Sequence, residues 1–347
     1  MMHLSDVLRA EKLFADEESK KIFSIRLDYL LGKNHFSFID DVPRDSYVCR
    51  EFQEYYKRHE GEKIIVYGAG DCGVYNAKAL KLCGYEVEAF CDSDDRLWGA
   101  EINNIPVISL TELDECKENM VVVISSTNYA HIGQMYTRLL ERQIARERIF
   151  CSAYRMLFAE RGHQYFDFFQ PLEHEVFVDG GVLDGNTSVE FTKWTNGKYD
   201  KIYMFEANRR NESQILNTMK KNNIQNYELI LQGLSDKSGR VPFDDSMEGG
   251  SRIISRGSSE IEVTSIDETI RGDVSFIKMD IEGAESAALA GAEQTIKRCK
   301  PRLAISVYHK SDDFVSIPLL LLKTNPQYQF ALRHYTASAN ETVLYAW

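Results

Sequence analysis

Five acidic residues in the second half of the sequence stand where a bound small molecule could meet them. Asp179 and Asp184 flank the glycine-rich turn "VDGGVLDGN", and Glu206 ends the next apolar run. Asp280 ends a later run, "FIKMD", and Glu282 follows two residues beyond. Carboxylates attract cations and accept hydrogen bonds from hydroxyl groups, whereas they repel phosphate. These residues therefore favour a ligand that carries a cationic group and hydroxyls.

The position of Glu206 narrows the ligand further. An acid at the carboxyl end of the second strand of a nucleotide-binding sheet can accept hydrogen bonds from both ribose hydroxyls. A ribose and an ammonium group without phosphate describe S-adenosylmethionine. The next apolar run leads into "LQGLSD", where Ser235 and Asp236 could face the adenine edge.

Methyl transfer to a hydroxyl needs an acceptor oxygen held in line and benefits from a base. We expect Asp280, Glu282 and His309 at strand ends on the catalytic rim. Two carboxylates so close could raise one pKa toward neutrality or share a divalent metal, and no metal is assigned. Lys278 could instead pair with one of the two. In the alternative interpretation, Glu282 and Glu285 only cap the following helix.

A second glycine-rich turn, "YGAGDCGVY", occurs about a hundred residues earlier. Gly68, Gly70 and Gly73 match the G-x-G-x-x-G pattern, and Asp92 ends the next apolar run, where a ribose-binding acid belongs. The pattern predicts a nucleotide or nucleotide-sugar site, although Asp71 adds a negative charge where a pyrophosphate would lie. Alternatively, the glycines only allow tight packing of a strand against a helix.

The elements that must position these residues follow an α/β pattern. Apolar spacing predicts a helical segment over residues 1–60. Short β-branched runs then alternate with helices, which predicts a Rossmann-like nucleotide-binding module at 61–160. An aromatic and charged bridge separates it from a second Rossmann-like domain at 172–347. Residues 244–263, rich in glycine and serine, are expected to form a surface loop, a hairpin or a lid over the substrate.

Seven runs in the second domain are expected to form strands of one sheet. They are "EVFVD", "KIYMFEA", "YELILQG", "VSFIKMD", "RLAISVY", "YQFALRH" and "ETVLYAW". The last two are joined by a polar turn, which predicts an antiparallel hairpin and a reversed strand at the sheet edge.

Composition limits the partners. The formal net charge is −12 and the acidic residues are spread along the chain, which argues against nucleic acid and anionic membranes. The seven cysteines show no CxxC pair and read as reduced, buried thiols, so a cytoplasmic location is expected. The longest aliphatic run, "IPLLLL", is too short to span a membrane.

Residues 172–347 resemble the FkbM family of S-adenosylmethionine-dependent methyltransferases. The resemblance is carried, in the family's order, by "VFVDGGVLDGNTS", "MFEAN", "LSDKSGRVPF", "TSIDETI", "FIKMDIEGAESAALAGAEQTI", "KPRLAISVYHKSDDFVSIPLLL" and "FALRHYTASANETVLYAW". It implies a class I methyltransferase fold and O-methylation of a hydroxyl on a sugar, glycan or natural product. The implied cofactor-binding residues are Asp179, Gly180, Gly181, Asp184, Glu206, Ala207 and Asp236.

The first block looks like the Rossmann modules of sugar-modifying and cell-surface glycan proteins, through "GYEVEAFCDSDDRLWGAEINNIPVISLTEL". The leading hypothesis is thus a methyltransferase acting on a sugar, glycan or other small molecule. Two alternatives remain open: an NAD(P)- or nucleotide-sugar-binding oxidoreductase, and a scaffold protein of polysaccharide biosynthesis. The sequence does not fix the oligomeric state, and a homodimer is one option.

Overall fold

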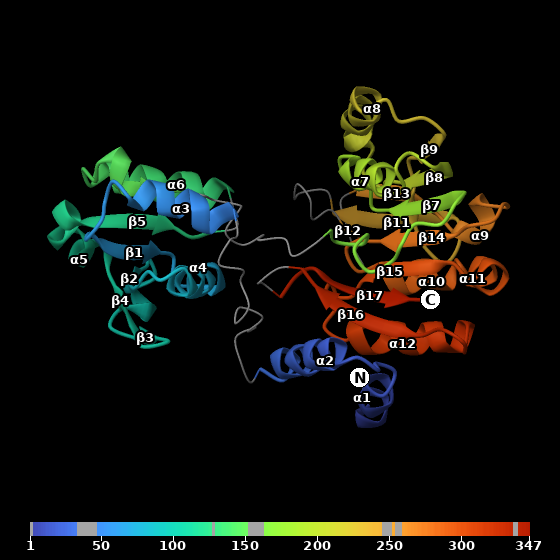
Figure 1. Cartoon of the computed structure of the whole chain (residues 1–347), viewed down its shortest axis with the longest axis horizontal. Coiled ribbons are helices and arrows are strands. Elements are labelled where there is room, and N and C mark those ends of the chain that lie inside the picture. Colours follow the sequence, from blue (N-terminus) through green and yellow to red (C-terminus); the bar gives the residue numbers. More distant parts are fainter. Residues whose placement is uncertain are drawn as a thin grey trace. The chain divides into compact units, whose positions relative to one another are not determined.

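The computed structural model describes residues 3–32, 47–126, 129–151, 163–244, 252–253, 259–335 and 339–347. The chain divides into two units, each of which is described by itself (Figure 1). Unit 1 comprises Met1–Leu31, Gly162–His334 and Glu341–Trp347. Unit 2 comprises Gly32–Arg161 and Tyr335–Asn340. Both units combine helices with sheets of largely parallel strands, as the sequence predicts.

Unit 2 contains, in the part that the structure describes, a six-stranded sheet in the order β3-β4-β2-β1-β5-β6. Its strands are β1 (Lys63–Tyr67), β2 (Val87–Cys91), β3 (Glu101–Ile102), β4 (Ile105–Ile108), β5 (Met120–Ile124) and β6 (Ile149–Phe150). Its helices are α3 (Tyr47–Tyr56), α4 (Asp71–Leu82), α5 (Leu110–Glu115) and α6 (Tyr129–Glu141). Neighbouring strands pair in parallel, apart from the short antiparallel hairpin of β3 and β4.

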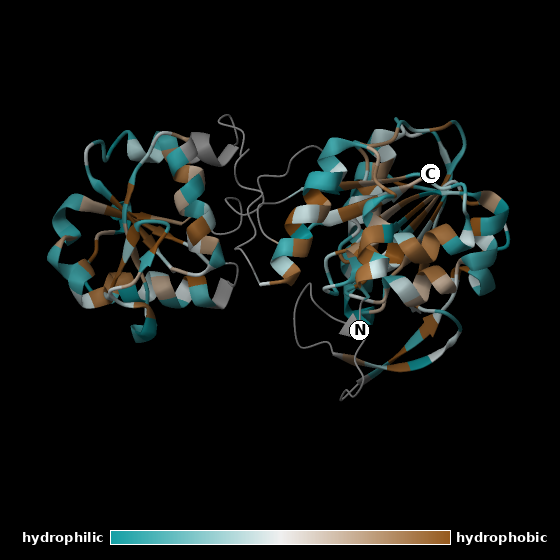
Figure 2. Ribbon diagram, turned by 90° about the horizontal axis from the view of Figure 1, so that it is seen from below, coloured by the Kyte–Doolittle hydropathy of each residue, from teal (hydrophilic) through white to brown (hydrophobic). Residues whose placement is uncertain are grey.

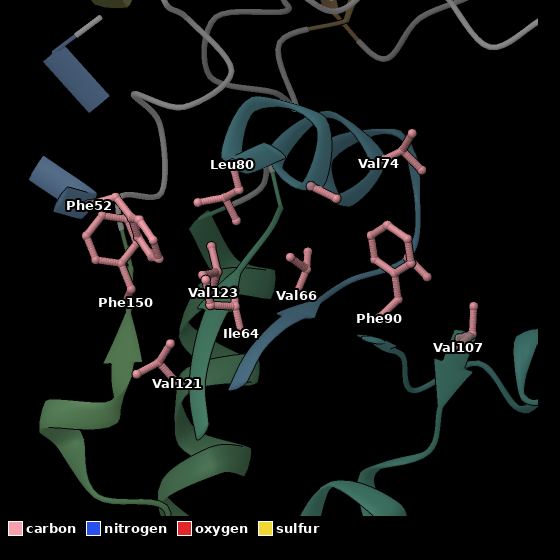
Figure 3. Packing of buried hydrophobic residues seen from close by; sticks show 12 residues of the cluster. Phe52, Ile64, Val66, Val74, Leu80, Phe90, Val107, Val121, Val123 and Phe150 are labelled. Atoms are coloured by element: carbon pink, nitrogen blue, oxygen red, sulfur yellow. The ribbon is translucent and has the colours of Figure 1, made fainter. Parts of the chain in front are cut away.

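The continuous apolar runs of β1 and β5 are buried on both faces, which is typical of a parallel sheet covered by helices. Ile64 and Val66 of β1 face one hydrophobic cluster, and Ile65 and Tyr67 face another. Figure 3 shows the first cluster, with the side chains of α3 and α4 over the sheet. Phe52 of α3 belongs to it, so α3 is part of unit 2.

Unit 1 is built on a seven-stranded sheet in the order β9-β8-β7-β14-β15-β17-β16, as far as the described residues show. Its strands are β7 (Glu175–Gly180), β8 (Tyr199–Phe205), β9 (Tyr227–Ile230), β14 (Phe276–Met279), β15 (Arg302–Ser306), β16 (Phe330–His334) and β17 (Thr342–Ala346). All seven predicted strands are present. The reversed strand, β17, lies between β15 and β16, so the edge strand itself is not reversed and that detail of the prediction is corrected.

The helices of unit 1 cover this sheet. They are α1 (Leu4–Glu11), α2 (Glu17–Leu30), α7 (Asn186–Trp194), α8 (Glu212–Lys221), α9 (Ile266–Thr269), α10 (Glu285–Ala290), α11 (Glu293–Cys299) and α12 (Asp313–Thr324). Helix α12 contains the aliphatic run "IPLLLL", which is largely buried. In Figure 2 the strands at the centre of each unit are hydrophobic, and the outer parts of the helices are largely hydrophilic.

A smaller sheet joins β10 (Gly233–Leu234), β13 (Ser259–Thr264), β11 (Gly239–Asp244) and β12 (Arg252–Ile253). Strands β11 and β13 are antiparallel, so the segment expected to be a loop, hairpin or lid contributes to a sheet. Residues 245–251 and 254–258 lie outside the described residues, so the lid stays a prediction.

The predicted helical segment 1–60 is divided between the units. Helices α1 and α2 belong to unit 1, where Phe14 forms a parallel bridge with Phe330 of β16. The Ser19 hydroxyl accepts a hydrogen bond from the backbone N–H of Leu332 at 2.8 Å. The ring centroids of Phe23 and Phe314 lie 5.1 Å apart. The two N-terminal helices are thus bound to the last helix and edge strand of unit 1.

Cys83 is disulfide-bonded, which contradicts the expectation that the cysteines are reduced. The other cysteines whose side chains the structure describes, Cys72, Cys91, Cys116, Cys151 and Cys299, are free thiols. Within the described residues, none of the helices combines the length and the apolar character that crossing a membrane requires.

Candidate active site

The carboxyl ends of β7 and β14 lie side by side in the unit 1 sheet, where the strand order reverses. Connections leave toward opposite faces at such a point and open a crevice for ligands. Strand β7 ends there at Gly180, and Gly181 follows it. A Cβ on Gly181, whose φ is +81°, would lie 1.9 Å from the carbonyl oxygen of Asp280. Glycine at this position therefore allows the turn after β7 to pack against the end of β14.

Asp179 points into the protein instead of toward this crevice. Its side chain is fully buried, with Oδ1 3.1 Å from Nζ of Lys278 and Oδ2 accepting a hydrogen bond from Ser188 at 2.8 Å. Lys278 also donates to the carbonyl oxygens of Gly180 and Gly181. The charge of Asp179 is therefore balanced inside the protein, and Lys278 pairs with Asp179, not with Asp280 or Glu282.

Glu206 lies directly after β8, at the carboxyl end of the second strand. Its Oε2 accepts a hydrogen bond from the Leu183 N–H at 2.8 Å, and its Oε1 accepts one from the Asn208 N–H at 2.7 Å. Burial raises the pKa of Glu206 above its usual value, although the hydrogen bonds from Asn208 and Leu183 act against this rise. The carboxylate thus joins the loop after β7 to the loop after β8.

A cavity of about 500 Å³ lies next to Ala207 and Asn208, the two residues that follow Glu206. Leu231, which follows β9, and Phe243 and Ile261 of the smaller sheet also line it. Cavities of this size are typical of small-molecule sites. The cavity therefore places a partly open volume at the carboxyl ends of β8 and β9.

Of the eight residues predicted to bind the cofactor, only Ala207 lines this cavity. Ser235 and Asp236 follow β10 of the smaller sheet, and Leu231 stands at the end of β9 in their place. The Ser235 hydroxyl donates to Asp236, whose side chain is exposed. Asp184 accepts hydrogen bonds from the backbone and side chain of Asn186, and so caps the start of α7.

The three predicted catalytic residues do come together. Nε2 of His309 lies 3.3 Å from Oδ1 of Asp280 and 3.6 Å from Oε2 of Glu282. Its other ring nitrogen, Nδ1, lies 2.8 Å from Oε1 of Glu285, the first residue of α10. Asp280 and Glu282 follow β14, and His309 follows the neighbouring strand β15. Two adjacent strands and one helix thus bring three carboxylates around one imidazole.

The surrounding carboxylates change the acid–base character of His309. Burial alone would lower the pKa of the imidazole, but the hydrogen bond to Glu285 and the charges of Glu285, Asp280 and Glu282 outweigh it and raise the pKa to about 9. The group therefore carries a positive charge near neutral pH in the absence of another cation. In that form the imidazole cannot accept a proton, so among the three predicted catalytic residues only the two carboxylates after β14 are able to accept one.

Sequence reasoning missed three residues of this cluster. The Tyr165 hydroxyl donates to Oδ2 of Asp280 at 2.8 Å, and the Tyr308 hydroxyl lies 3.2 Å from Oδ1. Tyr308 also lies 3.1 Å from Glu341, whose pKa is raised to about 7 by burial and by the charge of Asp280. Tyr308 could have been suspected from its place beside His309 at a strand end. Tyr165 and Glu341 carry no comparable signal.

The glycine turn of unit 2 is tightly packed against neighbouring backbone atoms of the same unit. A Cβ on Gly73 would lie 1.7 Å from the carbonyl oxygen of Gly68, whereas a Cβ on Gly70 would meet no atom within 4 Å among the described residues. Asp92 accepts hydrogen bonds from the N–H groups of Ala69 and Asp94. The carboxylate expected to bind a ribose therefore supports the turn, and tight packing explains two of the three glycines.

Comparison with known proteins supports the assignment of unit 1. Residues 179–332 match the family described as methyltransferase FkbM domain, and residues 60–150 match one described as C2185-like, N-terminal. No match is found among curated proteins.

A solved structure with a similar fold covers nearly the whole chain. A methyltransferase FkbM from Methylobacillus flagellatus KT superposes with a TM-score of 0.51 and 19% identity, over 99% of this chain and 98% of that one. An rRNA methylase from Streptococcus thermophilus has a TM-score of 0.35 and 16% identity, over 50% of this chain and 86% of that one. A fibrillarin from Aeropyrum pernix with bound S-adenosyl-L-methionine has a TM-score of 0.35 and 12% identity, over 52% of this chain and 69% of that one. No inference is drawn from the last two matches, whose TM-scores lie below 0.5.

The family match includes the turn after β7, the end of β8 and the Asp280–His309 region. The strand order β9-β8-β7-β14-β15-β17-β16, with a reversed strand next to the edge, is consistent with a Rossmann-like methyltransferase fold. Residues 179–332 are therefore a methyltransferase FkbM domain, and the protein is an S-adenosylmethionine-dependent methyltransferase.

Proposed function

We propose that the protein methylates a hydroxyl oxygen of a sugar, glycan or related small molecule. The observation that carries this proposal is the group of Asp280, Glu282 and His309 at the carboxyl ends of β14 and β15, with side-chain atoms within 3.6 Å of the His309 ring. Carboxylates and an imidazole can accept or donate hydrogen bonds to several hydroxyls at once. Such a set suits a polyhydroxylated acceptor better than an apolar one.

The residues present also fit S-adenosylmethionine. Glu206 offers a buried carboxylate at the carboxyl end of β8, and Ala207 and Asn208 line the neighbouring cavity. These residues would hold the ribose and the adenine side of the cofactor. When bound, S-adenosylmethionine supplies an electrophilic methyl group on its sulfonium. Asp179 would support the turn through Lys278 without touching the cofactor.

We propose that Asp280 is the base that removes the proton from the acceptor hydroxyl. Its carboxylate is about one quarter exposed and is oriented by the hydroxyls of Tyr165 and Tyr308. A base at this position takes the proton from the acceptor hydroxyl as the oxygen becomes a nucleophile. Glu282 and His309 lie beside Asp280 and would orient the neighbouring hydroxyls of the acceptor.

The substitution Asp280→Asn tests this role. We expect turnover to fall by about 10²–10⁴-fold, because general-base catalysis contributes about that factor. The affinity for S-adenosylmethionine, measured by calorimetry, should stay within about threefold, since Glu206 and the cavity are unchanged. Turnover is measured with labelled cofactor and a panel of nucleotide sugars and glycan fragments.

Two controls make the result specific. Asp273→Asn removes a carboxylate that is 94% exposed, and turnover should not change. Glu206→Ala should abolish binding of S-adenosylmethionine. Normal turnover in the Asp280→Asn variant would refute the role of Asp280, and methylation restricted to acceptors without a hydroxyl would refute the proposed substrate class.

The nucleotide site predicted in unit 2 stays a prediction. The open space at Gly70 is compatible with a ligand, whereas Asp92 is engaged by the turn itself. A nucleotide-linked sugar held by unit 2 would be consistent with the proposed acceptor of unit 1.

A further inference from the structure

The imidazole of His309 has one nitrogen satisfied and one not. Nδ1 is bonded to Glu285, whereas Nε2 has no hydrogen-bond partner among the described residues, although the side chain is only 7% exposed. The atoms nearest to Nε2 in the ion pairs are Oδ1 of Asp280 at 3.3 Å and Oε2 of Glu282 at 3.6 Å. Buried polar atoms without a partner are rare and often mark a missing ion or water.

We propose that a divalent cation binds between Nε2 of His309, Oδ1 of Asp280 and Oε2 of Glu282. Ligand atoms about 2.1 Å from a metal ion lie about 3.0 Å apart at adjacent octahedral corners and about 3.4 Å apart in a tetrahedron. The separations of Nε2 from Oδ1 of Asp280, 3.3 Å, and from Oε2 of Glu282, 3.6 Å, are close to these values. Both separations are longer than good hydrogen bonds.

The residues that contact these three side chains are arranged like the outer residues that orient metal ligands in known metal sites. Metal-binding histidines usually donate their other N–H to a carboxylate, and Glu285 fills that position from a fully buried site. Glu285 is itself oriented by the N–H of Ile281 at 3.0 Å. The ligand atoms of Asp280, Glu285 and His309 all lie within 4.8 Å of one another. Tyr165 holds the far oxygen of Asp280.

The charges select a cation. Asp280, Glu282 and Glu285 place three carboxylates around one ring, and the bound cation takes the place of the Nε2 proton. Two carboxylates with one imidazole suit Mn²⁺ better than Mg²⁺, because an imidazole nitrogen favours the softer transition ion. With three protein ligands, the remaining coordination positions are left for water or for an acceptor hydroxyl.

This site would serve the proposed function, on which its chemical role rests. A cation at this point lowers the pKa of an acceptor hydroxyl that binds to it, and the hydroxyl proton then passes to solvent or to a neighbouring carboxylate. Asp280 would then orient the cation and receive the proton through the same carboxyl group. The acceptor, and not the cofactor, would therefore require the metal.

The test is titration of Mn²⁺ into the full chain after treatment with EDTA, followed by calorimetry and by electron paramagnetic resonance. We expect one saturable site with micromolar affinity. His309→Ala and Glu282→Gln should each weaken it at least tenfold, and Glu285→Gln should weaken it by about 10–100-fold through loss of the outer carboxylate. Glu293→Gln, which changes an exposed carboxylate of α11, should leave the affinity unchanged.

Thermal unfolding of each variant without metal shows whether it is folded. The wild-type protein should gain thermal stability on adding Mn²⁺, and the His309→Ala variant should not. Absence of saturable binding below about 10 mM, or equal affinity in wild type and His309→Ala, overturns the proposal. Methyl transfer by the EDTA-treated protein would reject the metal and keep the proposed function. Mn²⁺ binding without methyl transfer to any hydroxyl would keep the metal site and reject the proposed function.

Discussion

Lys278 pairs with Asp179, a residue that the sequence analysis predicted to bind the ligand. Its ammonium neutralises Asp179 at a site where neither side chain has more than 2% exposure. Both residues stand in central strands, β7 and β14, directly below the glycine turn. A sequence pattern gives the position of Asp179 at a strand end, but not the direction in which its side chain points. The pair therefore stabilises the floor of the site.

Removing one partner of this pair should be severe. Lys278→Met leaves Asp179 buried without a counter-ion, and we expect the free energy of unfolding to fall by about 3–5 kcal/mol. Urea unfolding measures the change. Lys297→Met, which breaks an exposed ion pair with Glu293, should cost less than about 1 kcal/mol. Equal losses in the two variants would contradict the structural role assigned to Lys278.

At the residue scale, the sequence predicted three members of the acidic cluster but missed others. Asp280, Glu282 and His309 follow adjacent parallel strands, so their proximity could be predicted from strand ends alone. Tyr165 is 115 residues from Asp280 and lies in a segment without regular periodicity. Glu341 precedes the reversed strand β17. Nothing in their local sequence distinguishes these two side chains from exposed ones.

At the element scale, the two glycine turns share one packing rule and differ in what surrounds them. Gly181 lies against the backbone of Asp280, and Gly73 lies against the backbone of Gly68. Each close contact joins a strand end to its neighbour or to the following helix. The G-x-G-x-x-G pattern therefore predicts the strand–turn–helix geometry of unit 2 reliably, whereas that geometry does not by itself imply a ligand.

Alanine substitutions should distinguish Gly73, whose Cβ position is tightly packed, from Gly70, whose Cβ position is open. Gly73→Ala places a Cβ 1.7 Å from a carbonyl oxygen, so we expect a loss of at least about 2 kcal/mol in the stability of unit 2. Gly70 has φ −76°, which any residue can adopt, and its Cβ would meet no described atom within 4 Å. Gly70→Ala should change stability by less than about 1 kcal/mol.

Urea denaturation followed by circular dichroism provides the comparison. If the Gly73→Ala variant were as stable as the Gly70→Ala variant, the turn could not be packed as described. The Gly70→Ala variant should also keep unit 2 folded, which makes it the suitable variant for later titration with nucleotides.

At the scale of the whole molecule, the strand order of unit 1 could be predicted and the place of its first helices could not. Alternating strands and helices, with a final hairpin, restrict the sheet to few orders. Helices α1 and α2 show only amphipathic spacing, which says that one face is buried but not against what. The residues that bind them, such as Leu332 and Phe314, lie about three hundred positions later.

Deletion of residues 1–31 should therefore damage the methyltransferase unit. Phe14 and Phe23 are each no more than 2% exposed, and each such side chain contributes about 1.5–3 kcal/mol when buried. Together with Ile22, they predict a loss of about 5 kcal/mol or more in the stability of unit 1. Thermal unfolding and limited proteolysis measure it, with Leu4→Ala as control because Leu4 is 73% exposed. A truncated chain with unchanged stability would refute this docking.

The position of β17 inside the sheet has a consequence for the order in which the protein is made. A ribosome releases β15 and β16 before β17, yet β17 forms the ladder that joins them. Until Thr342–Ala346 have emerged, β16, with α2 packed against it, has no strand through which to join the rest of the sheet. The nascent methyltransferase unit therefore carries an open gap between two apolar strands, and it closes only after translation has passed Ala346.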